Sequence, residues 1–135
     1  MNVIERGCVM KLSDCIIKPD KVPGYIPEAH TGTVNQRLIG QETGAKNLEV
    51  LLGTVAAGGQ AEPHSHRSAE QVIYILAGSI EVEMWGERQV ATSGEAVFLP
   101  AGQTHRLSAY GGKPAKVLVI YAPPIQLTTQ PFQKK

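Results

Sequence analysis

Two of the four histidines in this 135-residue chain lie two positions apart, as His64 and His66 in the segment EPHSHRSAEQ. If this segment is a β-strand, both side chains point to the same face, with Cα atoms about 6.5–7 Å apart. Two imidazoles on one face can bind one divalent metal ion, each at about 2.0–2.1 Å. Pro63 favours an extended conformation for the residue before it, which agrees with a strand. The spacing predicts a metal site, although the pair alone is also compatible with two surface histidines.

A third histidine could complete such a site. His105 follows the tight turn expected at Pro100-Ala101-Gly102, and we expect it to begin the next strand. Three neutral imidazoles that converge inside one fold would suit a divalent ion.

A fourth ligand could come from Glu70 or Gln71. Because adjacent residues on a strand face opposite ways, only one of the two can normally reach the ion. If Gln71 faces inward, Ile73 and Ile75 line the interior with it, whereas an inward Glu70 would bring Tyr74 inside. An isoleucine lining suits an interior better, so we prefer Gln71 and keep Glu70 as the alternative.

The elements that must position these residues are short β-strands between Gly- and Pro-containing turns. Apolar, β-branched runs occupy residues 48–57, 71–78, 79–85, 95–102 and 115–124. In SIEVEMW, Ile80, Val82 and Met84 alternate with polar residues, as in a half-exposed strand. Strands that recur about every ten residues indicate a sandwich or a closed barrel. Residues 1–46 contain two β-like patches and three prolines, and we expect an arm with one or two edge strands packed on the barrel.

The spacing of these motifs resembles the two signatures of the cupin superfamily. The first signature is a glycine, five residues, His-x-His, three or four residues, Glu, six residues and a glycine, and it is matched by Gly58, His64, His66 and Gly78. The six-residue gap before Gly78 selects Gln71, whereas Glu70 fits the shorter gap after His66. The second signature is a glycine, five residues, Pro-x-Gly, two residues, His, three residues and Asn, and it is matched by Gly94, Pro100, Gly102 and His105, with Ala109 in place of the final Asn.

This resemblance implies an all-β, single-domain cupin β-barrel of the jelly-roll type with an N-terminal arm. The expected division is an arm with edge strands at 1–46, the barrel at 47–124 and a C-terminal tail at 125–135. The resemblance also implies a metal ion inside the barrel, held by His64, His66, His105 and Gln71, or by Glu70 in place of Gln71. The same histidines could instead line a cavity without metal, because some cupins bind sugars or nucleotides without one.

The donor set bears on the chemistry that we expect. Three histidines and a glutamine are uncharged, so a bound ion keeps its full charge and acts as a stronger Lewis acid. Zn, Ni, Fe, Mn or Co would suit such ligands. We therefore expect a metal-dependent enzyme of the isomerase, lyase or hydratase type that acts on a small organic acid, keto compound or sugar derivative. The metal motif also resembles that of small cupins that act on unsaturated uronates in pectin breakdown. The alternatives are an Fe(II)-dependent dioxygenase and a non-catalytic cupin that binds a small ligand.

Three residues outside the metal motif are candidates for a catalytic role. Glu62 could transfer protons or lie at the barrel mouth as an ordinary polar residue. Tyr74 could contact a substrate, although, like Phe98, it fits the core better. His30 is most simply a loop histidine, but it could meet the ligand, as could Arg37, if the arm covers the barrel mouth.

Composition and charge exclude several other classes. The net charge of +1 gives no reason to expect nucleic acid or an anionic membrane as a partner. No apolar run approaches the roughly 18 residues of a membrane span, and the N-terminus lacks the apolar region of a signal peptide. Cys8 and Cys15 match no common metal spacing, so we expect free thiols and a cytoplasmic protein. Apolar surface at Met84, Trp85 and the arm predicts a homodimer. Besides the second copy of the chain, the partner that we expect is a small-molecule ligand or substrate.

Overall fold

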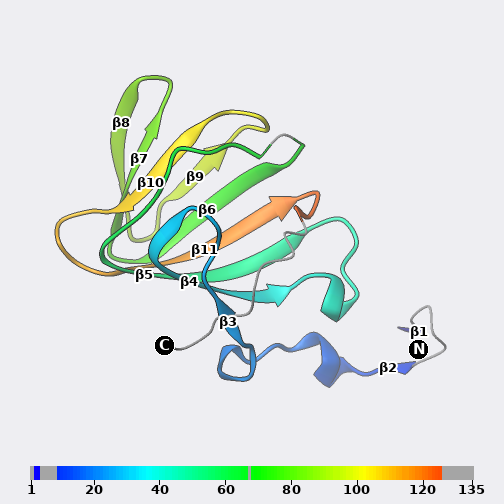
Figure 1. The fold of residues 1–135 in the computed structure, drawn as a ribbon. Helices are drawn as coiled ribbons and strands as arrows, with labels where there is room; N and C mark the ends of the chain where they lie inside the picture. Colours follow the sequence, from blue (N-terminus) through cyan, green and yellow to red (C-terminus); the bar gives the residue numbers. More distant parts are fainter. Residues whose placement is uncertain (1, 4–8, 67, 126–135) are drawn as a thin grey trace.

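The chain is an all-β protein, and this computed structural model describes residues 2–3, 9–66 and 68–125 (Figure 1). The strands are β1 (Asn2–Val3), β2 (Val9–Met10), β3 (Gly24–Tyr25), β4 (His30–Ile39), β5 (Glu49–Ala61), β6 (Glu70–Ala77), β7 (Ser79–Met84), β8 (Glu87–Thr92), β9 (Ala96–Leu99), β10 (His105–Ala109) and β11 (Ala115–Ala122). Three short 3-10 helices are η1 (Leu12–Cys15), η2 (Pro19–Lys21) and η3 (Gln41–Thr43).

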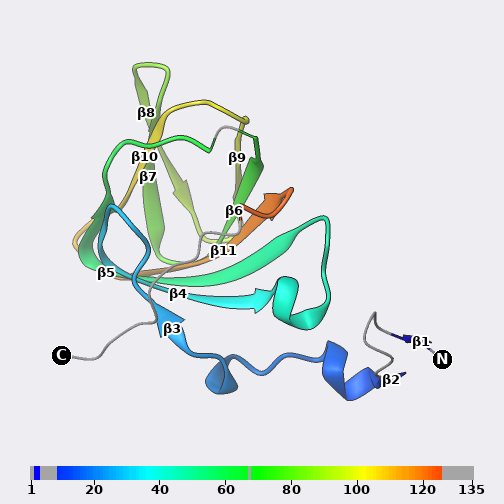
Figure 2. The same ribbon diagram turned by 45° about the vertical axis from the view of Figure 1, so that its right-hand side comes forward.

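Nine of these strands form one antiparallel sheet that curls into a nearly closed barrel (Figures 1 and 2). The main path of the sheet runs β8-β7-β10-β5-β11-β6-β9, and β4 pairs with β5 and with β3. Each of the five apolar runs singled out in the sequence contains or overlaps a strand, and His105 begins β10 as expected. The predicted all-β barrel is confirmed.

The core lies inside the barrel, where alternate residues of the strands face one another. On β6, Ile73 and Ile75 are buried while Tyr74 between them is exposed, and on β7 Ile80 and Val82 are buried as their alternation predicted. Most of the buried apolar side chains in the described residues form one cluster of twelve: Leu51, Val55, Ala69, Ile73, Ile75, Ile80, Val82, Leu99, Ala115, Val117, Val119 and Tyr121. Tyr121 of this cluster contacts the ring of His66.

Glycine is required at the turn between β6 and β7. Gly78 has φ of +76°, and a Cβ there would lie 2.4 Å from the carbonyl oxygen of Pro114. Any side chain would therefore clash with backbone. The second glycine of the first sequence signature thus serves the packing of two loops against each other.

The N-terminal region contributes more to the barrel than edge strands alone. β4 is ten residues long and pairs antiparallel with β5. The pairing begins with His30 opposite Ala61 and ends with Ile39 opposite Val50. Before β4, the chain crosses its outer side, where the Gln36 amide donates hydrogen bonds to the carbonyl oxygens of Pro19 (2.7 Å) and Val22 (2.9 Å). The division of the chain at residue 46 stays a prediction, and the tail from residue 126 onward lies outside the described residues.

The two sides of the barrel differ in what they present outward. On β7 the outward residues are Glu81 and Glu83, whereas β5, β11, β6 and β9 present two adjoining rows without a charged residue. We call these rows the outer apolar face; they comprise Val50, Leu52, Val72, Tyr74, Ala96, Phe98, Leu118 and Ile120. All eight are partly or fully exposed. The expectation that Tyr74 and Phe98 belong to the core is therefore wrong, because both strands are apolar on two faces and the pattern alone cannot say which face is covered.

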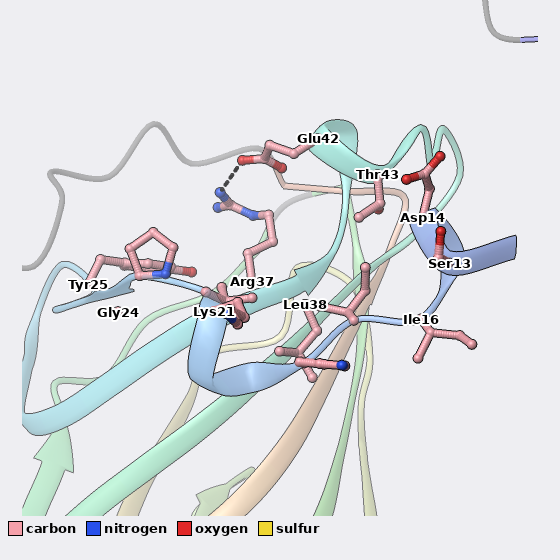
Figure 3. A pocket seen from close by; sticks show the side chains of 14 residues that line it. Ser13, Asp14, Ile16, Lys21, Gly24, Tyr25, Arg37, Leu38, Glu42 and Thr43 are labelled. Carbon is pink, nitrogen blue, oxygen red and sulfur yellow. Dashed lines mark ion pairs between the residues drawn. The ribbon is translucent and has the colours of Figure 1, made fainter. Parts of the chain in front are cut away.

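A wide groove of about 800 Å³ separates the arm from β4 (Figure 3). Ile16 and Ile17 lie on the arm side, and Leu38 and Arg37 lie on the barrel side. The Arg37 guanidinium is held by Glu49 at 3.1 Å and by Glu42 at 3.6 Å. None of His30, His64, His66 and His105 lines this groove.

Two further expectations concern the compartment. Cys15 is a free, exposed thiol, as expected, and Cys8 lies outside the described residues. Among the residues that the structure describes, no helix has the length and apolar character needed to cross a membrane.

Candidate metal centre

Three histidines converge at one end of the barrel interior. His64, His66 and His105 each offer a ring nitrogen, and these three atoms all lie within 4.8 Å of one another. The ring centroids are 4.5 Å apart for His64 and His105, and 5.0 Å apart for His64 and His66. Among the described residues, this is the one group of His, Cys, Asp or Glu side chains close enough together to hold a metal ion.

The convergence does not arise in the way that the sequence suggested. The described residues after the end of β5, 62–66, form no named strand, so the same-face argument for His64 and His66 does not apply. Instead, His64 forms an isolated bridge with His105, in which each amide donates to the other's carbonyl at 3.0 and 2.8 Å. The Gly102 amide also donates to the carbonyl oxygen of His66 at 2.9 Å. Backbone hydrogen bonds between the two sequence signatures bring the rings together.

Hydrogen bonds to backbone carbonyls orient two of the rings. His64 Nδ1 lies 2.7 Å from the carbonyl oxygen of Glu62, and His105 Nδ1 lies 3.0 Å from that of Gln103. Because a carbonyl only accepts, Nδ1 must carry the proton in each ring. The Nε2 lone pair of each neutral imidazole is then available to a ligand, which is the arrangement typical of metal-bound histidines.

Gln71, not Glu70, faces the histidines. The Gln71 side chain is 3% exposed and lies on the inner side of β6 with Ile73 and Ile75, whereas Glu70 is exposed. On the neighbouring strand β11, Tyr121 lies opposite Gln71, and the Tyr121 ring centroid is 5.0 Å from that of His66. Gln71, Ile73 and Ile75 therefore share the inward face of β6, as the spacing of the isoleucines predicted.

Three buried polar atoms of this group have no hydrogen-bond partner within the described part of the chain: His66 Nε2, His105 Nε2 and Gln71 Oε1. Buried polar atoms are nearly always satisfied, because an unpaired one costs about 1–3 kcal/mol. Imidazole nitrogens and an amide oxygen are donors that a divalent transition metal accepts, and Gln71 lines the same cavity as His64, which belongs to the histidine group. The residues present therefore fit a metal ion, and the three-histidine cluster is consistent with such a site.

Burial keeps the imidazoles of His66 and His105 neutral at neutral pH. Burial, and then the neighbouring rings of His64 and His105, lower the pKa of His66 to about 4. Burial and His64 likewise lower the pKa of His105 to about 4, against the opposing effect of its hydrogen bond to the Gln103 carbonyl. A metal ion would therefore not have to displace a proton from either ring above roughly pH 5.

A small cavity of about 50 Å³ adjoins the histidines. His30, His64 and Gln71 lie on its wall together with four polar residues that the sequence analysis did not single out: Thr33, Asn35, Gln60 and Ser108. Thr33 and Asn35 are both buried on β4, and their spacing of two was the available signal. The remaining residues of the wall are apolar except Tyr121, which has a hydroxyl group.

The three catalytic candidates are placed differently. His30 begins β4 and lines the cavity, with its ring 5.5 Å from that of His64, and burial lowers its pKa. Tyr74 lies on the outer apolar face, on the opposite side of β6 from the cavity, so the structure removes it as a substrate contact. The Glu62 side chain is exposed and does not line the cavity; its backbone carbonyl orients His64. Arg37 also lies away from the cavity, in its ion pair with Glu49.

Comparison with known proteins agrees with this fold and site. The sequence matches the Cupin domain family over residues 51–121, and the chain belongs to the cupins. It is 32% identical over 69 residues to the tetracenomycin polyketide synthase protein TcmJ of Streptomyces glaucescens, a match that covers 51% of this chain and 46% of that protein. It is 30% identical over 63 residues to the pectin degradation protein KdgF of Dickeya dadantii, which covers 47% of this chain and 57% of that protein.

The fold is also similar to that of a solved polyketide cyclase structure. The structure of the polyketide cyclase RemF from Streptomyces resistomycificus superimposes with a TM-score of 0.75 and 24% sequence identity, over 94% of this chain and 89% of that one. The chain spans about half the length of the two curated relatives. These likenesses establish the family and the fold.

Proposed function

We propose that this cupin is a metal-dependent enzyme of the isomerase, lyase or hydratase type, acting on a small organic acid, keto compound or sugar derivative. His64, His66, His105 and Gln71 would hold the ion. The observation that carries the proposal is the group of three histidines whose ring nitrogens lie within 4.8 Å of one another, together with three buried atoms that have no partner within the described residues: His66 Nε2, His105 Nε2 and Gln71 Oε1.

The donor set favours Lewis-acid chemistry. A divalent ion held by four neutral ligands keeps its charge available to polarise a carbonyl or enol oxygen of a ligand. The chain supplies the rest: the carbonyls of Glu62 and Gln103 hold two rings in one tautomer, and apolar side chains around Ile73 form much of the cavity wall. Preorganised groups beside an apolar wall strengthen such polarisation.

Two relatives support this class of substrate. One is named for a polyketide synthase and the other for pectin degradation. Polyketides are rich in ketone groups and pectin is built from sugar acids, so both fit the carbonyl or carboxyl ligands that the site would take. The matches cover about half of this chain, so the reaction itself is part of the proposal.

The metal content of the protein tests the proposal most directly. Protein purified without added metal should contain close to one zinc or nickel per chain by elemental analysis, and should convert a keto acid or sugar acid without consuming oxygen. Chelation should lower Tm, because an ion that binds only the folded chain stabilises it. Iron together with oxygen uptake would instead indicate the dioxygenase, and a stable, metal-free protein that binds ligand would indicate the non-catalytic cupin.

We also propose that the protein forms a homodimer through the outer apolar face. Its two rows contain aromatic residues and no charge, the composition typical of the centre of a homodimer interface. Strands that are apolar on both faces are generally covered on both. Four strands at about 4.8 Å and two rows of residues span about 20 Å by 13 Å, less than the about 800 Å² that each partner buries in a stable interface. The arm, with exposed Leu12 and Ile16, would supply the remainder.

This location differs from the one that the sequence suggested. Trp85 lies in the turn between β7 and β8, and Met84 packs against the core. The β7–β8 hairpin is far from the N-terminal arm in both views (Figures 1 and 2). Met84 and Trp85 cannot share one patch with the arm.

A pair of charge substitutions tests the dimer. Phe98→Glu should convert the protein from a species of twice 14.5 kDa to a monomer at tens of micromolar in light scattering, because a carboxylate would be buried without a partner. Val90→Glu is the matched control: Val90 is 41% exposed, close to the 53% of Phe98, but it lies on β8. A monomeric wild type, or dissociation by both variants alike, would contradict this interface.

A further inference from the structure

His30 is the one histidine that the metal group leaves over. Its ring lines the same cavity, 5.5 Å from the ring of His64. It is not a member of the group whose nitrogens lie within 4.8 Å of one another. His30 is therefore placed beside the proposed ligands rather than among them, where it faces whatever occupies the cavity.

The ring of His30 is oriented in the same way as two of the proposed ligands. His30 Nδ1 lies 2.8 Å from the carbonyl oxygen of Glu28, two residues earlier, as His64 Nδ1 and His105 Nδ1 do with theirs. The carbonyl can only accept, so Nδ1 is the donor and carries the proton. In the neutral ring Nε2 then has a lone pair and no hydrogen. His30 can accept a hydrogen bond from a ligand but cannot donate one.

The backbone around His30 is fixed at some conformational cost. Ala29 has φ of +62°, a left-handed conformation that is uncommon for a residue with a side chain. Its carbonyl oxygen accepts a hydrogen bond from the Glu62 amide at 2.8 Å, and His30 pairs with Ala61. The start of β4 is thereby tied to the segment that leads into His64. Strained residues of this kind persist where the surrounding structure holds them, often beside functional sites.

The cavity limits what can meet His30. Its volume is about 50 Å³, well below the roughly 300–1,000 Å³ of pockets that enclose a whole ligand. None of the described residues on its wall is an acid, a lysine or an arginine. Only the reactive end of a ligand can enter, and His30 Nε2 can be satisfied there only by a group that donates a hydrogen bond.

We propose that His30 selects ligands that carry a hydroxyl group next to the oxygen that approaches the metal site, such as 2-hydroxy acids and enols. The hydroxyl donates to His30 Nε2, and a ligand that lacks it cannot make this hydrogen bond. The proposal narrows the substrate class of the proposed function and rests on it, in that the ligand enters the same cavity. It assigns His30 to recognition of the ligand, not to metal binding.

Two ligands that differ in one hydroxyl test this role. Lactate and propionate are titrated into full-length protein of measured metal content, and the ratio of their Kd values is compared across variants by NMR or calorimetry. The wild type should prefer lactate. His30→Phe, which keeps a ring but has no acceptor, should reduce that preference by a few-fold to about tenfold, the worth of one hydrogen bond. His30→Gln places an amide oxygen near the position of Nε2 and should restore part of it.

The controls separate this proposal from the metal assignment. Both variants should retain the metal content of the wild type, and Thr31→Val, at the exposed neighbouring position, should leave the lactate preference unchanged. A wild type without the preference, or a preference that His30→Phe leaves intact, would overturn the role of His30. Loss of metal from His30→Phe would overturn it too, by making His30 a ligand. Turnover is not needed for any of these outcomes, so a failure of the proposed enzymatic activity would be seen separately.

Discussion

Replacing His66 with alanine is expected to remove the metal from the protein. His66 Nε2 is buried and has no hydrogen-bond partner within the described residues, so no protein group competes with a metal ion for its lone pair. Loss of a direct ligand should cost more than the roughly 10–100-fold in affinity that loss of an outer hydrogen-bonding group costs. Elemental analysis after dialysis should fall from about one ion per chain to almost none.

Thermal unfolding shows whether the variant has lost a ligand or its fold. Added metal at a hundredfold excess over Kd should stabilise the wild type by about 2.7 kcal/mol, roughly 10 °C in Tm for a domain of this size. The metal-free forms of His66→Ala and the wild type should unfold at similar temperatures, and only the wild type should respond to the ion. His30→Ala is the control for a nearby histidine outside the group. Full metal content in His66→Ala would refute the site.

A second large difference is expected between two adjacent residues. Gln71→Ala should weaken metal binding by about tenfold or more, because its buried Oε1 has no hydrogen-bond partner within the described residues and its side chain lines the cavity beside His64. Glu70→Ala should leave the affinity nearly unchanged, because the Glu70 side chain is exposed on the other side of β6. The two residues are adjacent on β6 and have side chains of the same length, but Gln71 is buried and Glu70 is exposed. Equal effects of the two substitutions, or a larger effect at Glu70, would contradict Gln71 as the fourth ligand.

The sequence was most informative where spacing reports geometry directly. The two histidine signatures identified the residues that meet in the structure, and the isoleucine spacing on β6 indicated which of Glu70 and Gln71 faces inward. The reason given for the meeting of His64 and His66 was nevertheless wrong. The chain between β5 and β6 forms no strand, and hydrogen bonds to residues 36 to 41 positions further on hold it in place. Local periodicity contains no information about contacts of that length.

Two strands were missed for opposite reasons. β8 is exposed along almost its whole length, so no burial pattern marks it. β4 has its inner residues Thr33 and Asn35 against a polar cavity, so it lacks the apolar alternation by which a half-buried strand is usually identified. The same polar lining explains why His30 looked like a loop residue. A strand that serves a polar site resembles a loop in a sequence, because its buried face is chosen for the ligand and not for the core.

The reciprocal hydrogen bonds between the amides and carbonyls of His64 and His105 have a consequence for selectivity among ions. They fix the separation of two proposed ligands through peptide groups, so the gap between the rings does not depend on an occupant. Under the proposed function, an ion could leave and another enter while the chain kept its shape. Because the distance between the two rings would stay fixed, ions would be selected by how well their radius matches that distance. Movement of the chain toward the ion would play little part.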